Sequence, residues 1–417
     1  MDFKGKKLLI LAGAGVHSKL VKAAKEMGVY TIVTDNVPNS PAKSMSDEAF
    51  DINIFELNDL EKLCIEKKVD GIISCFIDPC QRPYNELCER MNYRCYGTKD
   101  QFFLMTDKHA FKKMCIENNV DVIPEYKENE INEVVFPVFV KPVDSRGSRG
   151  QSVCYTKEEL VQAIEFAKSE SSNGDILIEK YMKGAHEFQV TYFFKDGEAY
   201  LLRTVDSYCG SEEKHLEKVV ACAVSPSRFT ELYLKTSHEK VVKMFKKMGL
   251  KNGPVFMQGF EDDGVFRFFD PGLRFPGVDY DLIYKKVYDV DVMKAMISIA
   301  LSGDCQDTIL PEDGVFIKGK RAAVLFPTIK AGIIGKKDGE EQIANMKEVV
   351  SYLPRWDVGE SVSWAYNVNQ RLAEIDILCD DTESLKETIN LIQKELKIKN
   401  VDGEDMTYEL FDTTRII

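Results

Sequence analysis

The chain has 417 residues, more than one hydrophobic core usually holds, so about two or three domains are expected. Apolar residues make up 44% and charged residues 29%, as in an ordinary soluble globular protein. The net charge of −13 argues against a nucleic-acid binder, because contacts with phosphates need a basic surface.

The eleven cysteines are scattered, form no C-x-x-C pair, and several stand in apolar runs. Such cysteines are typical of buried, reduced thiols, so we expect a cytoplasmic protein without a zinc site. The basic and apolar start of the chain imitates a secretory signal, but a helix and a second strand are expected directly after it, which favours a buried first strand. No run of about 18 apolar residues occurs, so no membrane span is expected.

The first hundred residues alternate between strand and helix patterns. Strands are predicted at 7–12, 30–34, 71–74 and 93–96, and helices at 18–27, 57–67 and 84–91. This alternation is typical of a parallel, doubly wound sheet.

A second region begins with a helical stretch at 100–118 and a polar surface linker at 127–133. Apolar strands follow at 134–140, 176–178, 188–194 and 200–205, then a helix at 231–248, strands at 255–260 and 265–269, and a helix at 291–301. From about residue 311 the pattern changes to short strands with Gly turns, a helix at 382–396 and a strand near 406–411. This last part predicts a separate α+β piece.

The first motif is Gly13-Ala14-Gly15 after a strand, with Asp35 about twenty residues further on. It is part of a dinucleotide fingerprint, but Ser18 stands where the third Gly is needed. We therefore favour a tight turn that packs strand against helix, and an NAD-dependent enzyme is the disfavoured alternative.

A stronger motif is an apolar strand that ends in Lys141-Pro142 and leads into a loop of Ser, Arg and Gly up to Gly150. Backbone N–H groups of such a loop approach phosphate oxygens closely, and a lysine at the strand end adds a positive charge. The pattern favours a phosphate-binding loop over an exposed hairpin.

Two further segments carry weaker signals by themselves. Glu179-Lys180-Tyr181 ends a strand and could present backbone groups to an adenine edge, with Glu187 near ribose hydroxyls, although the segment alone is only a charged strand end. Gln258 and Asp270 are expected on adjacent strands around the turn 262–264. Together they offer two hard oxygen ligands for Mg²⁺, and Arg274 offers a fork for phosphate or carboxylate.

In this order and spacing, these elements resemble the ATP-grasp superfamily, which includes biotin carboxylase, the carbamoyl-phosphate synthase large subunit and the purine-pathway carboxylate-amine ligases. The resemblance implies an α/β and α+β fold in three parts: a Rossmann-like pre-grasp domain (1–100), a two-lobed ATP-grasp domain (101–310, with a lid lobe at about 127–181) and a small mixed C-terminal domain (311–417). It implies ATP-binding roles for a set of residues: Lys108, Lys141, Ser145, Arg146, Gly147, Ser148, Gly150, Glu179, Lys180, Tyr181 and Glu187. It also implies Gln258 and Asp270 as ligands of Mg²⁺ or Mn²⁺, and Arg274 together with Lys141 as catalytic residues.

The chain departs from the family at one position of the metal motif. The family usually has Glu-x-Asn-x-Arg, whereas this chain has Asp270-Pro271-Gly272-Leu273-Arg274, and Gly272 has no side-chain oxygen. The implied activity is an ATP-dependent ligase that activates a small carboxylate as an acyl phosphate for attack by an amine or similar nucleophile, in a monomer or a homodimer. The alternatives are a biotin-carboxylase-like enzyme that activates bicarbonate, disfavoured because no biotin-carrier segment is present, and a non-catalytic ATP-binding protein.

Overall fold

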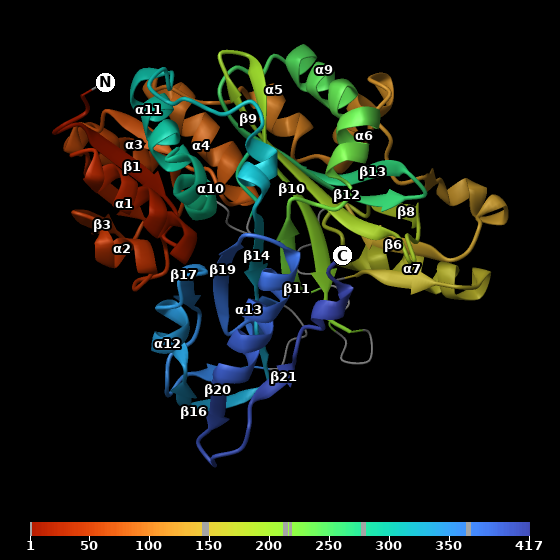
Figure 1. The fold of residues 1–417 in the computed structure, drawn as a ribbon. Helices are drawn as coiled ribbons and strands as arrows, with labels where there is room; N and C mark the ends of the chain where they lie inside the picture. Colours follow the sequence, from red (N-terminus) through yellow and green to blue (C-terminus); the bar gives the residue numbers. More distant parts are fainter. Residues whose placement is uncertain (1, 144–149, 212–215, 217–218, 277–280, 364–367) are drawn as a thin grey trace.

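The computed structural model describes residues 2–143, 150–211, 216, 219–276, 281–363 and 368–417. Figure 1 shows three regions: the N-terminal layer at one side, a small lobe at the opposite side, and the C-terminal part below them. Each region has its own hydrophobic core cluster, although the largest cluster extends from the N-terminal layer into the central sheet.

The N-terminal layer is a four-stranded parallel sheet in the order β3-β2-β1-β4. Its strands are β1 (Lys7–Leu11), β2 (Tyr30–Thr34), β3 (Glu48–Phe50) and β4 (Gly71–Ile73), and its helices are α1 (Ser18–Glu26), α2 (Pro41–Met45), α3 (Leu57–Lys67) and α4 (Asp78–Met91). The predicted alternation is confirmed, and β1 and β2 are buried on both faces beyond their first residues. The prediction missed α2 and β3, which are short.

The predicted strand at 93–96 is wrong. Asn92 adopts a left-handed conformation that ends α4, and the following chain is anchored by its tyrosine hydroxyls instead of a strand ladder. Tyr93 donates to the Val69 carbonyl and Tyr96 donates to the carbonyls of Ser74 and Leu273, at 2.6, 3.0 and 3.0 Å.

The small lobe is a four-stranded sheet in the order β5-β8-β6-β7 with one helix against it. Its elements are β5 (Glu125–Tyr126), β6 (Val138–Pro142), β7 (Ser152–Cys154), α7 (Lys157–Glu170) and β8 (Ile176–Lys180), and residues Glu128–Glu133, expected as a linker, form a 3₁₀ turn. Two helices, α5 (Lys99–Leu104) and α6 (Lys108–Glu117), connect this lobe to the N-terminal layer.

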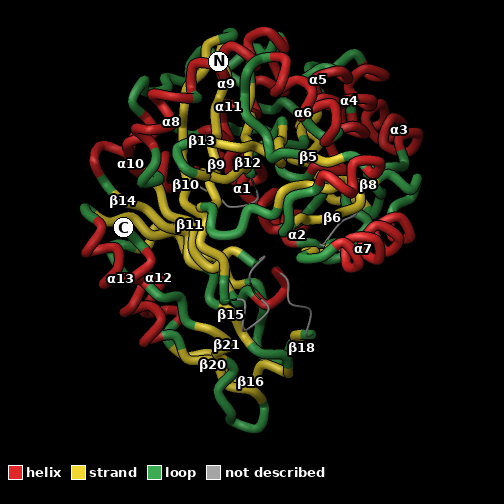
Figure 2. The backbone as a smooth tube through the Cα atoms, turned by 90° about the vertical axis from the view of Figure 1, so that its right-hand side faces the viewer, coloured by secondary structure: helices red, strands yellow, loops and turns green. Residues whose placement is uncertain are grey.

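The central element is an eight-stranded sheet in the order β13-β12-β9-β10-β11-β14-β19-β17. Figure 2 labels its strands β9 to β14. Its strands before residue 311 are β9 (His186–Lys195), β10 (Glu198–Cys209), β11 (Val220–Ser225), β12 (Gly253–Asp262) and β13 (Val265–Gly272). The strands β14 (Arg321–Leu325), β17 (Val349–Pro354) and β19 (Ala373–Cys379) continue the same sheet into the C-terminal part. The eight-stranded sheet therefore continues across the predicted boundary at residue 310. The domain limits stay predictions.

Helices α8 (Thr230–Thr236) and α9 (His238–Met248) connect β11 to β12, and helices α10 (Asp281–Tyr288) and α11 (Val292–Ser302) come after β13. One continuous helix was predicted at 231–248, but Ser237 leaves helical geometry, and Thr236 turns its hydroxyl back to the Leu232 carbonyl at 2.8 Å. Helix α11 lies against α1 and β4, so a late segment covers the N-terminal sheet.

The remaining C-terminal elements form two small sheets and a helix layer. They are β15 (Thr328–Ile329), β16 (Gly332–Asp338), α12 (Glu340–Ala344), β18 (Ser361–Val362), α13 (Thr382–Glu395), β20 (Lys397–Asn400) and β21 (Thr407–Glu409). The predicted helix at 382–396 is confirmed, with a capping box formed by Asp381 and Ser384.

Candidate functional site

The first two residues of the candidate site are lysines on one face of α6. Asp107 caps the helix, its carboxylate accepting from the Ala110 N–H at 2.8 Å, which fixes the first turn where Lys108 stands. Lys112 follows one helical turn later and therefore lies on the same face as Lys108. Burial lowers the pKa of Lys141 and the positive charge of Lys108 adds to that effect, while the same charge opposes the raised pKa of Asp270.

A buried group of three charges forms where β6 and β8 pair. Glu179 is 1% exposed and its carboxylate binds the ammonium groups of Lys141, at 2.5 Å, and of Lys112. Burial would raise the pKa of Glu179, but the charges of Lys141 and Lys112 hold that pKa below its usual value. Burial lowers the pKa of Lys141, and Glu179 opposes that effect. Glu179 thus helps a buried lysine keep its charge, as an electrostatic contact with phosphate requires.

The segment after Glu179 is held by backbone hydrogen bonds. The N–H groups of Lys180 and Tyr181 donate to the carbonyls of Pro124 and Pro137, at 2.9 and 3.0 Å. The Lys180 side chain reaches across to Asp262 on β12 at 3.1 Å. This segment therefore joins the small lobe to the large sheet.

Three oxygen-bearing side chains lie on the large sheet beside this junction. Gln258 and Asp270 are directly opposite each other on β12 and β13, so their side chains share one face of the sheet. Gln258 donates its amide N–H to Glu187, which stands on the neighbouring strand β9. Burial raises the pKa of Glu187. Burial also raises the pKa of Asp270, with a contribution from Asp78, against the charges of Lys108, Arg274 and Lys141.

Arg274, just beyond β13, is bound from several sides. Its Nε and Nη2 groups donate to the carboxylate of Asp78 at the start of α4, and its Nη1 group donates to the Phe275 carbonyl at 2.9 Å. The guanidinium lies 4.7 Å from the centre of the Phe256 ring. Arg274 therefore ties the N-terminal layer to the large sheet.

The structure pairs several of the predicted site residues. Lys141 binds Glu179, Gln258 donates to Glu187, and Gln258 lies opposite Asp270. Arg274 follows β13 and binds Asp78, and Lys108 stands in the first turn of α6. Lys180 and Tyr181 flank this group on the connecting segment. Gly150 lies beside Pro142 where the chain returns to β7, and Ser145, Arg146, Gly147 and Ser148 lie outside the described residues. Their roles stay predictions.

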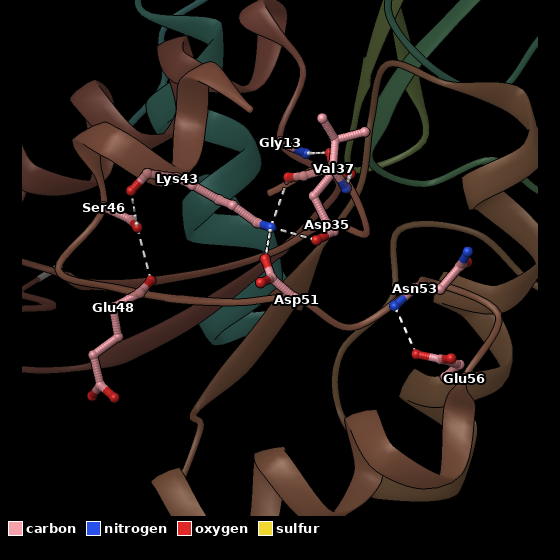
Figure 3. Close-up of polar contacts among 9 residues, drawn as sticks. All are labelled: Gly13, Asp35, Val37, Lys43, Ser46, Glu48, Asp51, Asn53 and Glu56. Carbon is pink, nitrogen blue, oxygen red and sulfur yellow. Dashed lines mark hydrogen bonds and ion pairs between the residues drawn. The ribbon is translucent and has the colours of Figure 1, made fainter. Parts of the chain in front are cut away.

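The Gly13-Ala14-Gly15 turn has the geometry of a packing turn. The Gly13 N–H donates to the Asp35 carboxylate at 2.6 Å, and the other oxygen of that carboxylate accepts from the Val37 N–H at 2.8 Å (Figure 3). A Cβ on Gly13 would lie 2.1 Å from the Ser40 hydroxyl oxygen, so only glycine fits there. Because Asp35 is bound by its own chain, the geometry favours the tight turn over a ribose-binding carboxylate.

Lys43 braces the same edge of the sheet. Its ammonium donates to the carbonyls of Asp35 and Val37 and to the Asp51 carboxylate, the latter two at 2.8 and 2.5 Å (Figure 3). It is 7% exposed, so these acceptors compensate for its burial. This lysine holds a loop and is not directed to the group around Lys141.

Three residues of the site were not predicted from the sequence. Lys112 carried a usable signal, since it stands four positions after Lys108 on a helix. For Asp78 and Arg371 the sequence contained no such signal, because their partners are far away in the sequence. Arg371 is 7% exposed, lies 4.0 Å from the centre of the Phe326 ring, and its charge acts on Glu187. It brings a cation from the C-terminal part towards the site.

The donor set at Gln258 and Asp270 fits a hard divalent cation at one position, since a carboxylate and an amide oxygen are ligands that Mg²⁺ accepts together with phosphate oxygens. Within the described ranges, no three His, Cys, Asp or Glu side chains form a ready-made metal cluster. A cation here would therefore depend on ligands from a bound nucleotide.

Among the residues that the structure describes, no helix combines the length and apolar character required to cross a bilayer.

Residues 107–270 match the family model described as carbamoyl-phosphate synthase L chain, ATP binding domain. The 2-oxoglutarate carboxylase small subunit of Hydrogenobacter thermophilus is 26% identical over 324 residues, covering 71% of this chain and 66% of that protein. The formate-dependent phosphoribosylglycinamide formyltransferase of Francisella tularensis is 24% identical, covering 48% of this chain and 54% of that protein. The chain thus spans less than two thirds of the length of these relatives.

Solved structures share the whole fold at low identity. Phosphoribosylglycinamide synthetase from Anaerococcus prevotii has a TM-score of 0.77 at 19% identity, covering 95% of this chain and 100% of that chain. The biotin carboxylase domain of the Hydrogenobacter thermophilus 2-oxoglutarate carboxylase, in complex with MgADP, ADP and bicarbonate, has a TM-score of 0.75 at 18% identity, covering 96% and 91%. The L-amino acid ligase from Bacillus licheniformis has a TM-score of 0.76 at 16% identity, covering 95% and 99%.

Proposed function

Because this chain has the ATP-grasp fold, with its ATP-binding domain over residues 107–270, we propose that it is an ATP-dependent ligase that activates a small carboxylate. The carboxylate takes the γ-phosphoryl group of ATP, and an amine or similar nucleophile then attacks the resulting acyl phosphate. The observation that carries the proposal is that Lys141 of the small lobe reaches the large sheet: its ammonium lies 5.6 Å from the centre of the Phe269 ring, next to Asp270 on β13.

The lysines bind and orient the phosphates. Lys141 is held charged beside Glu179, so it presents a fixed positive charge at the end of β6 without reorganisation. Lys108 adds a second charge from the first turn of α6. Phosphoryl transfer needs mostly positioning and charge neutralisation, and these two residues supply both.

Gln258 and Asp270 would hold Mg²⁺, which supplies charge neutralisation on the phosphates when bound. Arg274 has the bidentate geometry that recognises a carboxylate, as its contact with Asp78 demonstrates. The Arg274 side chain is 11% exposed and that of Asp78 is 41% exposed, so a substrate carboxylate would have to replace Asp78 on the guanidinium.

A biotin-carboxylase-like activity is the second candidate, since relatives of this type are among the matches and bicarbonate is also a small carboxylate-like acceptor. The test is ADP and phosphate release with ATP and Mg²⁺, screened against amino acids, other small carboxylates and bicarbonate, each with and without an added amine. Release that requires one carboxylate and one amine supports the ligase. Stimulation by bicarbonate and free biotin alone would favour the second candidate, and nucleotide binding without release under any condition would refute both.

A further inference from the structure

The position next to Asp270 on β13 is filled by an aromatic ring from the opposite strand. Gly272 and Phe256 are cross-strand partners, on the same face as the pair Asp270 and Gln258. A Cβ on Gly272 would lie 2.2 Å from the Phe256 ring, and any side chain at this position would have to displace it. The ring is 3% exposed, so it is packed in place.

The same ring also supports the cation beside it. The Arg274 guanidinium lies 4.7 Å from the ring centre, while its donors are bound to Asp78 and Phe275. The cation–π contact and the burial together hold Phe256 against Gly272. The ring cannot leave this place without losing its cation–π contact with Arg274.

The remaining oxygen donors suffice for one cation. Gln258 uses its amide N–H on Glu187, which leaves the amide oxygen as the atom available to a metal. Asp270 adds one carboxylate, and Gly272 adds no side-chain donor. In the motif that the chain resembles, an Asn oxygen would stand where the Phe256 ring is packed here.

We propose that this site holds one divalent cation per nucleotide, on Asp270 and the Gln258 amide oxygen, and that Phe256 closes the neighbouring position to a second one. The inference rests on the proposed function, because the phosphates of a bound nucleotide complete the coordination. Glu187 acts as a positioning residue that orients the Gln258 amide. The aromatic ring thus sets the metal stoichiometry of the site.

The test counts Mn²⁺ on the full chain by electron paramagnetic resonance, with a non-hydrolysable ATP analogue whose own binding is measured by calorimetry. One Mn²⁺ per bound nucleotide is expected. Two or none, with the nucleotide bound, would overturn the inference and leave the proposed function standing. Failure of the analogue to bind would overturn both.

Substitutions test the metal ligands and the Phe256 ring independently of each other. Glu187→Gln should weaken Mn²⁺ binding by about 10-fold or more, as loss of an outer-shell partner does. The control Asp263→Asn removes the same charge at the exposed turn of this hairpin, where a positive φ of 52° suits Asn, and should leave the binding unchanged. Equal effects of both would mean that only the net charge matters.

The role of the Phe256 ring is tested by substituting Gly272 and Phe256 singly and together. Gly272→Asn should lower the melting temperature, and Phe256→Ala in the same chain should recover part of that loss. The double variant should also raise the Mn²⁺ count from one to two. A folded double variant that still binds one Mn²⁺, or a Gly272→Asn variant with unchanged melting temperature, would overturn the assignment to the ring.

Discussion

Glu179→Gln should destabilise the protein strongly, although the replacement has the same shape. It removes the negative charge that Lys141 and Lys112 share while leaving both ammonium groups buried. Lys141 is 5% exposed and Lys112 is also 5% exposed, so water cannot replace the lost carboxylate. The two like charges would then face each other across a neutral amide.

The magnitude follows from the burial of all three groups. Removing one partner of a buried ion pair costs about 3–5 kcal/mol, because the remaining charge is left uncompensated. Here that charge is Lys141, since Lys112 keeps the Glu125 carboxylate at 2.9 Å. The amide oxygen of Gln still accepts one hydrogen bond, so about 3 kcal/mol is expected. The pKa of Lys141, already lowered by burial, should fall further, and raising the pH should therefore relieve part of the loss in the variant.

The assay is urea unfolding with and without an ATP analogue. The nucleotide phosphates restore an anionic partner for Lys141, so the analogue should stabilise Glu179→Gln by more than it stabilises the wild type, provided that it binds at saturating concentration. Glu128→Gln is the matched control. Glu128 pairs with Lys168 at 2.7 Å on the surface, with side chains 47% and 37% exposed, and its loss should cost less than about 1 kcal/mol.

Equal and small losses in the two variants would refute this reasoning. So would a large loss in Glu179→Gln that the nucleotide analogue does not reduce, since the buried lysines would then have no access to the phosphates.

Three further predictions use other parts of the chain. Lys141→Ala should weaken ATP binding by about 1.5–3 kcal/mol in calorimetry, whereas the exposed Lys127→Ala should leave it unchanged. Similar effects of the two changes would mean that Lys141 does not contact the phosphates. Burial lowers the pKa of His17 from 6.5 to about 4. Between these two pH values the unfolded chain binds a proton at His17 and the folded chain does not, so the stability falls as the pH falls through that window. His17→Asn should therefore reduce the loss of unfolding free energy between about pH 7 and pH 5 by about 2 kcal/mol, and an unchanged loss in urea titrations would contradict this. Gly13→Ala should lower the melting temperature, and Ser40→Gly in the same chain should recover part of that loss; an unchanged melting temperature of Gly13→Ala would contradict this.

Local patterns in the sequence were sufficient for much of the fold. Apolar runs such as those of β1 and β2 and the amphipathic helices α1 and α3 follow from hydrophobic periodicity, which depends on near neighbours only. The helix at 231–248 shows the limit. Its periodicity continues through residues 236 and 237, but side-chain hydrogen bonding to the backbone interrupts it there, which a pattern of apolar positions does not reveal.

The site was predictable where a residue stands at the end of its own strand, as Lys141 does. Contacts between distant segments were not. Arg274 binds Asp78 across 196 positions, and only the folded chain brings them together. Similarly, Gly272 reads from the sequence as a missing ligand, and only the strand register reveals that Phe256 stands opposite it.

The large sheet has a consequence for how this protein can be divided. Three of its eight strands, β14, β19 and β17, come from beyond residue 310, and they cover β11. A fragment that stops at residue 310 would turn β11 into an open edge, with a row of unpaired N–H and C=O groups available to other chains. Such a fragment invites edge-to-edge aggregation, so the C-terminal part protects the nucleotide-binding half from self-association, whatever else it contributes to the chemistry.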